Sequence, residues 1–202
     1  QVAGNGSYKA PDLTLDRLTL TAPGLQLLAQ GDLDLDAQKL DFSYDVDLSD
    51  MALVREFAPE EYRDVDGRMK AKGTVIGPFD ELDIKGEVAG QDLRLEDREI
   101  GQLTGTYDVL LGDDMRLDAR LEAEGGMLEE KGHLNASMLR ASEALQIKDL
   151  DLDLAGLAAK GELDVDLDKL TFTGDLDAAS EDLSLLGRLA GLELAGAMEA
   201  HL

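Results

Sequence analysis

Carboxylates are the residues of this chain with the most obvious capacity for chemistry, because they recur at every second position in several short runs. Three of these runs cover residues 32–36, 149–153 and 164–168. Such spacing is typical of calcium-binding loops, but an EF-hand loop also needs glycine at its sixth position and glutamate at its twelfth. All three runs hold other residues there: Ala37, Leu154 and Lys169 at the sixth position, and Ser43, Lys160 and Asp175 at the twelfth. We therefore expect solvated charges and no metal cofactor, with a weak surface cation site as the alternative.

The other candidate catalytic residues form no recognisable group. His133 and His201 are far apart in the sequence, and neither lies next to a second residue typical of a zinc site or of a Ser-His-Asp triad. Gly4 and Gly6 belong to neither a P-loop nor a dinucleotide-binding pattern. The chain has no cysteine, which excludes disulfides, thiolate metal ligands and a cysteine nucleophile. The sequence thus predicts no catalytic residues, no cofactors and no enzyme activity.

Charge and composition restrict the partners of the chain. Its 202 residues carry a formal net charge of −25, which repels phosphate and argues against nucleic acid as a partner. Hydrophobic residues make up 44% and aromatic residues 4%, so the apolar surface is mainly aliphatic. No apolar run reaches the roughly 20 residues that a transmembrane helix needs. Because the chain begins at Gln1 and stops within an apolar alternation, we expect it to be a piece of a longer protein.

Alternation of apolar and polar residues is the main signal for secondary structure. Residues 40–48 read LDFSYDVDL, and similar runs occur at residues 33–35, 150–154 and 163–167. Because successive residues of a strand point to opposite faces, these runs predict strands with one dry face and one wet face. The residues predicted to line the dry face are Leu33, Leu35, Leu40, Phe42, Tyr44, Val46, Leu48, Leu150, Leu152, Leu154, Leu163, Val165, Leu167, Leu170 and Phe172. Polar or glycine-containing breaks separate the runs, so the fold class is all-β, with about a dozen short antiparallel strands.

Two stretches, residues 50–57 and 182–189, depart from this alternation. Each opens with an aspartate suited to cap a helix and spaces its apolar residues as a short helix does. Both belong to an internal repeat, in which residues 13–67 correspond to residues 145–196. The offset is 132 residues over most of the repeat, 130 between Gly31 and Phe42, and 129 where Gly67 corresponds to Gly196. We interpret residues 1–202 as a fragment of one repetitive domain, in which strands are added along one axis.

The dry face has two alternative roles. In most one-sided sheets such a face packs against a second sheet, which would make this chain a closed structural spacer. Alternatively, the sheet folds lengthwise into a trough whose dry face stays partly open for acyl chains. The alternation by itself favours the closed core, because that is the ordinary arrangement of a one-sided sheet.

One segment, residues 65–88, carries a more specific pattern: VDGRMKAKGTVIGPFDELDIKGEV. It resembles the repeats of the TamB and AsmA-like family of bacterial envelope proteins, in which glycines, aliphatic residues and a Gly-Pro pair recur at fixed spacing. The positions that match are Gly67, Met69, Ala71, Gly73, Thr74, Val75, Gly77, Pro78, Phe79, Ile84, Gly86 and Val88. Leu82 departs from the pattern, since the family usually has a second proline there. The two predicted helices also resemble segments of this family, so the resemblance covers essentially the whole chain.

The resemblance implies a β-taco, a long curved sheet that is U-shaped in section and has an aliphatic interior. It implies a periplasmic location, with an inner-membrane anchor and an outer-membrane partner of the TamA barrel type, both engaged through regions outside these residues. The implied function is transport of phospholipid between the inner and outer membranes, with the acyl chains in the hydrophobic groove. The alternatives are chaperone-like assistance of outer-membrane β-barrel assembly, with unfolded strands held at the sheet edges, and the closed spacer.

Overall fold

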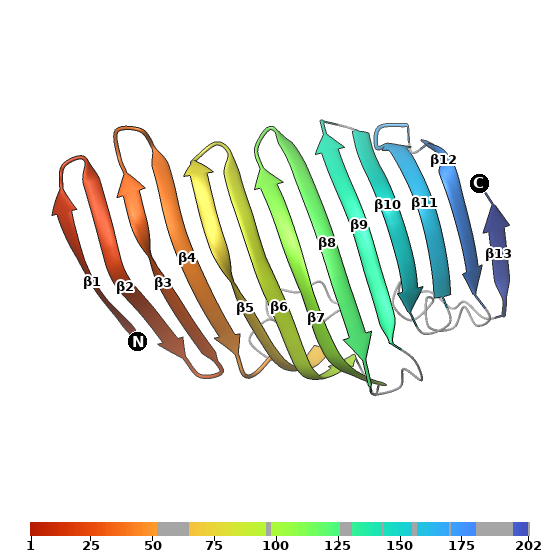
Figure 1. Ribbon diagram of the computed structural model, residues 1–202, viewed down its shortest axis with the longest axis horizontal. Helices are drawn as coiled ribbons and strands as arrows, with labels where there is room; N and C mark the ends of the chain where they lie inside the picture. Colours follow the sequence, from red (N-terminus) through yellow and green to blue (C-terminus); the bar gives the residue numbers. More distant parts are fainter. Residues whose placement is uncertain are drawn as a thin grey trace.

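The computed structural model describes residues 1–51, 65–95, 98–125, 131–142, 144–154, 157–169, 171–180 and 196–201. These residues form one sheet of thirteen strands (Figure 1). The strands are β1 (Val2–Lys9), β2 (Asp12–Ala22), β3 (Leu25–Asp34), β4 (Lys39–Leu48), β5 (Val65–Pro78), β6 (Leu82–Leu95), β7 (Arg98–Leu111), β8 (Asp114–Glu124), β9 (Gly132–Ala141), β10 (Ala144–Leu154), β11 (Leu157–Asp166), β12 (Thr171–Ser180) and β13 (Met198–His201).

The strands lie in the sheet in their order along the chain, and each is antiparallel to the next. β1 and β13 form the two outer edges, so the sheet is open rather than closed into a barrel. The predicted all-β, antiparallel class is therefore confirmed.

The two predicted helices lie almost entirely outside the described residues. Of residues 50–57 only Asp50 and Met51 are described, and of residues 182–189 none is. The described part of the chain contains no helix, and accordingly none that is long and apolar enough to cross a membrane.

Asp34 and Asp166 end β3 and β11 in the same way. In each case the Oδ1 atom accepts hydrogen bonds from the backbone N–H groups two and three residues later, at 2.8–3.2 Å. Turns of this kind are characteristic of aspartate and take the chain out of the strand. The alternation predicts that Leu35 and Leu167 continue these strands. That placement is wrong, because both residues lie in the turns, where they are 46% and 36% exposed.

Two irregularities of strand pairing recur at the same offset as the sequence repeat. The register between β2 and β3 shifts between Leu15 and Leu18, and the register between β10 and β11 shifts between Ile147 and Leu150. The positions correspond at an offset of 132. Bulges of this kind increase the local twist of a strand, so the two hairpins share a local distortion as well as a pattern.

The next hairpins keep this offset without the two-residue shift of the sequence alignment. Leu33 pairs with Leu40 at the turn between β3 and β4, and Val165 pairs with Phe172 at the turn between β11 and β12. A shift of two residues leaves every side chain on the same face of a strand. The alternating pattern therefore fits both offsets, and only the pairing distinguishes them.

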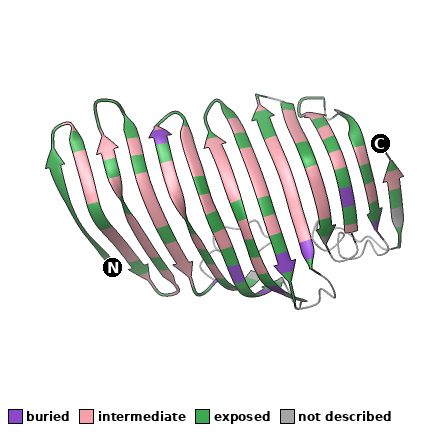
Figure 2. Ribbon diagram, in the orientation of Figure 1, coloured by how far each residue is buried: buried purple, intermediate pink, exposed green. Residues whose placement is uncertain are grey.

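Few side chains of the described residues are buried. Met51, Leu93, Ala123 and Ala159 are the buried hydrophobic residues there, and no large side chain among the described residues is fully buried. Figure 2 shows half-buried residues along the middle of most strands and buried ones at only a few places. Two packed sheets would bury most of their inner faces, and the described strands form a single sheet.

Candidate functional site

The pairing of β3 with β4 sorts their residues onto two faces. Residues directly opposite each other in an antiparallel pair share a face, and the faces alternate along the strand. One set of pairs is apolar: Leu25 with Leu48, Leu27 with Val46, Ala29 with Tyr44, Gly31 with Phe42, and Leu33 with Leu40. The positions between these pairs carry mainly aspartate, glutamine and serine on β3 and β4. The predicted dry and wet sides of β4 are thus opposite faces of the sheet.

One row of directly paired residues extends this apolar side from β4 to β10. It contains Val46, Ala71, Val88, Gly105, Leu121, Leu134 and Leu152. Because paired residues share a face, the apolar residues of β4 and those of β10 lie on the same side of the sheet. We call the side that carries this row the apolar face, and the opposite side the polar face.

Most of the residues predicted to line the dry face come together on the apolar face. They are Leu33, Leu40, Phe42, Tyr44, Val46 and Leu48 from β3 and β4, and Leu150, Leu152, Leu163 and Val165 from β10 and β11. Leu154 and Phe172 occupy strand positions without described side chains, and Leu170 lies outside the described residues. Contact between these residues and lipid stays a prediction.

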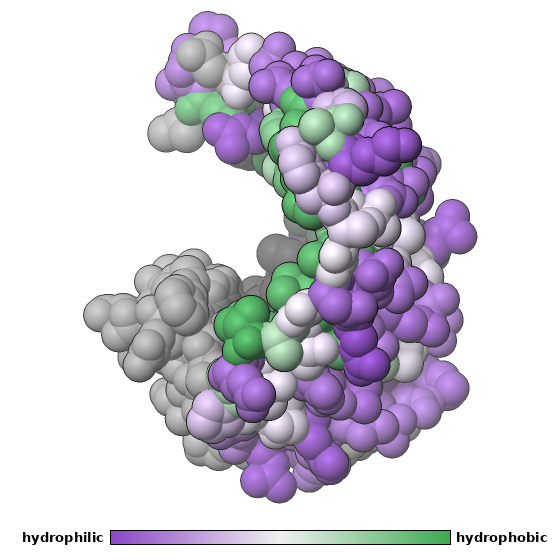
Figure 3. Space-filling view, turned by 90° about the vertical axis from the view of Figure 1, so that its left-hand side faces the viewer, coloured by the Kyte–Doolittle hydropathy of each residue, from purple (hydrophilic) through white to green (hydrophobic). Residues whose placement is uncertain are grey.

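The apolar face remains accessible. Every residue in the row from Val46 to Leu152 is half-buried, and none is buried. Seen along its long axis, the described part of the sheet is curved, with hydrophilic residues over the convex side and hydrophobic residues along the concave side (Figure 3). Aliphatic surface that water still reaches can bind an apolar ligand with a favourable free energy.

The polar face carries cross-strand ion pairs. Lys70 and Asp47 approach to 2.7 Å, and Lys72 and Glu87 to 3.0 Å. Lys70, Lys72 and Glu87 are largely exposed and Asp47 is partly exposed, so the pairs contribute little to stability. Their effect is to give this face a solvated surface of mixed charge.

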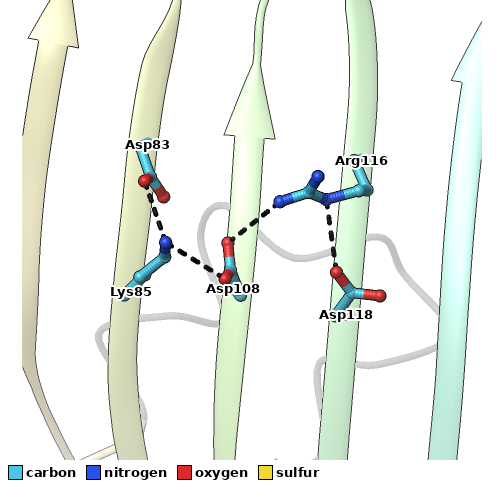
Figure 4. A network of polar contacts seen from close by, with 5 residues as sticks. All are labelled: Asp83, Lys85, Asp108, Arg116 and Asp118. Atoms are coloured by element: carbon cyan, nitrogen blue, oxygen red, sulfur yellow. Dashed lines mark ion pairs between the residues drawn. The ribbon is translucent and has the colours of Figure 1, made fainter.

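A denser network joins β6, β7 and β8 on the same face (Figure 4). Asp108 and Asp118 are directly opposite each other, an arrangement that is destabilising for like charges. The Arg116 guanidinium lies 3.7 Å from Asp108 and 3.2 Å from Asp118, while Lys85 Nζ lies 3.3 Å from Asp108 and 2.9 Å from Asp83. Hydrogen bonds to Asp83 and Asp108 raise the pKa of Lys85. The two cations therefore offset the repulsion between the facing carboxylates.

The two histidines each contact an aspartate on a neighbouring strand. His133 Nε2 lies 3.1 Å from Asp151 Oδ1, and hydrogen bonds from His133 and then Lys160 lower the pKa of Asp151. The hydrogen bond between His201 and Asp177 raises the pKa of His201. Neither pair extends to a metal site, because the described residues contain no group of three or more potential ligands.

Two open hollows of about 960 Å³ each cross β5–β9. Their linings share Lys72, Glu87, Thr106, Arg120 and Asn135. These residues form one transverse row of the polar face, so the two hollows are furrows on either side of this row of longer side chains.

A tyrosine pair on the apolar face was missed by the sequence analysis. The hydroxyls of Tyr44 in β4 and Tyr107 in β7 are hydrogen-bonded to each other, although β5 and β6 lie between the two strands. Gly73 and Gly86 occupy the intervening positions of the same row. The alternation places Tyr44 on the dry face, but only the pairing of four strands places Tyr107 opposite it. The two glycines, which belong to the motif of residues 65–88, were the available signal.

Comparison of the chain with models of protein families, with curated proteins and with solved structures finds no match.

Proposed function

We propose that this chain is a segment of a hydrophobic conduit that carries phospholipid between the inner and outer membranes of a bacterial envelope, and that it is not an enzyme. In this proposal the sheet is a β-taco, a trough whose aliphatic interior is the apolar face. The observation that carries the proposal is the unbroken row of half-buried apolar positions from Val46 to Leu152.

The dimensions of the sheet suit acyl chains. Thirteen strands spaced about 4.8 Å apart give a continuous surface about 58 Å long. Each methylene group that leaves water for this surface contributes about 0.8 kcal/mol. Aliphatic contact is non-directional, so adjacent positions along the trough hold a tail about equally well. Such a surface favours movement along the sheet over tight binding at one place.

The charge distribution fits the same function. The polar face carries charged residues at the paired positions of neighbouring strands. They contribute to the strong acidity of the chain, whose net charge is −25. This charge keeps the outer surface solvated and repels anionic membrane surfaces. The phospholipid headgroup would travel at the open, wet edges of the trough.

The closed spacer is less well supported. A closed core needs a second layer over the apolar face, and the described strands supply only one sheet. Chaperone-like assistance of outer-membrane barrel assembly is the second candidate function. It is favoured by the outer edge of β1, with which no described strand pairs and whose eight residues are all exposed, because an open edge can accept an extended peptide.

The remaining parts of the proposal rest on the resemblance of residues 65–88 to the TamB and AsmA-like family. They are the periplasmic location, the inner-membrane anchor and an outer-membrane partner of the TamA barrel type. Anchor and partner site are assigned to regions other than these residues.

Photo-crosslinking from adjacent residues tests the proposal. Leu121 pairs with Gly105 and Leu134 on the apolar face, whereas its neighbour Arg120 pairs with Thr106 and Asn135 on the polar face. A photoreactive phenylalanine analogue at position 121 should form covalent adducts with phospholipid in bacterial cells, and the same analogue at position 120 should not. Equal adduct yields at the two positions, or none at either, would overturn the proposal.

A further inference from the structure

Tyr44 and Tyr107 are the polar side chains of an otherwise apolar part of the apolar face. Among the described, regularly paired positions of this face from β2 to β8, theirs are the only side chains with hydrogen-bonding groups. Both tyrosines are half-buried. Burial and the hydrogen bond to Tyr107 raise the pKa of Tyr44 above its ordinary value of 10.0. Its hydroxyl therefore stays protonated and able to donate at neutral pH.

The two rings lie over a pair of glycines. Gly73 and Gly86 are directly opposite each other in β5 and β6. A methyl group at Gly73 would lie 2.8 Å from the Tyr44 hydroxyl oxygen, and one at Gly86 would lie 2.7 Å from Cζ of Tyr107. Cβ atoms in proteins essentially never approach another atom so closely. The bare backbone of the glycines is what allows the rings to reach one another along the sheet.

The hydrogen-bonding capacity of this pair is not used up. Each phenol has one O–H donor and can also accept. The bond between the hydroxyls uses one of the two donors, and within the described part of the chain neither hydroxyl bonds to any other residue. One O–H thus has no protein partner among the described residues, and it can donate to a ligand on this largely aliphatic surface.

We propose that the Tyr44–Tyr107 pair binds an ester carbonyl oxygen of a phospholipid, holding the glycerol region of the lipid over Gly73 and Gly86. This inference rests on the proposed function and adds a defined polar site to the path of the lipid. Acyl tails then lie along the apolar face to either side, over residues such as Ala29 and Ala119 in the same transverse row. An ester carbonyl accepts a hydrogen bond without bringing a charge onto the face, which suits a neutral O–H donor.

The test compares two phospholipids that differ only at this position. One carries ester-linked palmitoyl chains and the other the corresponding ether-linked chains, which have no carbonyl groups. The native chain should bind the ester lipid about 2- to 10-fold more tightly than the ether lipid, the worth of one neutral hydrogen bond. Replacement of both tyrosines by phenylalanine (Tyr44→Phe with Tyr107→Phe) should abolish this preference while the ether lipid binds as before.

Tyr8→Phe is the matched control. Tyr8 pairs with Leu13 on the same face, at the outer strand, and is 63% exposed. Its loss should leave the preference for the ester lipid intact. The ester lipid can be labelled with ¹³C at its carbonyls and its carbonyl stretching band followed by infrared spectroscopy. This band should be shifted to lower wavenumber when the lipid is bound to the native chain or to Tyr8→Phe, but not when it is bound to the double variant. Binding of both lipids with equal affinity and no shifted band would overturn the tyrosine site alone. Binding of neither lipid would overturn the conduit as well.

Discussion

Replacing Val165 with arginine tests whether the apolar face is open in solution. Val165 pairs with Leu145, which in turn pairs with Arg140, so a natural arginine already lies in the same transverse row of the apolar face. Arg140 is exposed, and no described carboxylate forms an ion pair with it. A long cationic side chain at position 165 can reach water as Arg140 does, because its methylene groups can follow the apolar surface while the guanidinium stays solvated.

The expected loss of stability follows from the burial of Val165. Full burial of a valine side chain is worth about 1.5–3 kcal/mol, and Val165 is only half-buried. Val165→Arg should therefore reduce the free energy of unfolding by about 1 kcal/mol. In a closed core the same change leaves an unpaired buried charge, which costs about 3–5 kcal/mol. The two arrangements thus differ by more than the error of the measurement.

Asp164→Arg is the control for this change. Asp164 is exposed and pairs with Gln146 and Thr173 on the polar face, so its replacement should alter stability by less than about 0.5 kcal/mol. Urea unfolding followed by circular dichroism gives the free energies by linear extrapolation. If Val165→Arg unfolds the chain while Asp164→Arg remains native, the apolar face is covered in solution and the open trough is excluded.

Three further predictions concern the tyrosine pair, the last strand and metal ions. Gly86→Ala should lower the free energy of unfolding by about 1–3 kcal/mol in urea, because its Cβ would overlap both Tyr107 and the backbone oxygen of Lys72. Gly112→Ala, with its nearest neighbour at 3.5 Å, should stay within about 1 kcal/mol of the native chain, and similar values for both variants would contradict the close packing around Gly86. Because Asp177 raises the pKa of His201, the protonated pair stabilises β13. This stabilisation is fully present below pH 6.5 and is lost as the pH rises through the raised pKa. Amide hydrogen exchange in β13, corrected for intrinsic rates, should therefore accelerate as the pH rises through the pKa of His201 in the native chain, but not in His201→Gln. Protection of β13 that is independent of pH in both proteins would refute this link between His201 protonation and strand stability. EDTA should leave the melting temperature unchanged, since the described residues offer no group of three metal ligands, and a fall of more than about 4 °C would reveal a structural cation.

The sequence was sufficient to predict the class of fold and the sides of individual strands. The alternation over residues 40–48 corresponds to β4, and its apolar residues share one face with those of β3. This succeeds because strand geometry converts a local period of two directly into opposite faces. The same local rule wrongly extended β3 to Leu35 and β11 to Leu167. Both strands end one residue earlier, because the side chains of Asp34 and Asp166 accept hydrogen bonds from the backbone that follows.

Contacts across several strands could not be predicted in this way. Tyr44 and Tyr107 are 63 residues apart and meet only because β5 and β6 place Gly73 and Gly86 between them. Alternation fixes which face a residue occupies but not its position along that face, since a shift of two residues preserves the pattern. The register of each hairpin, and with it the tyrosine pair, depends on turns and bulges whose signals in the sequence are short and local.

The most direct test of the lipid conduit is to identify what the chain carries when it is purified from a bacterial envelope under mild conditions. Organic extraction and mass spectrometry, with protein quantified in the same sample, give the identity and the molar ratio of bound lipid. We expect phospholipid in near-stoichiometric amount in the native chain, and its loss when Leu121 on the apolar face is replaced by a charged residue. A monodisperse, folded chain that is consistently free of lipid would contradict it.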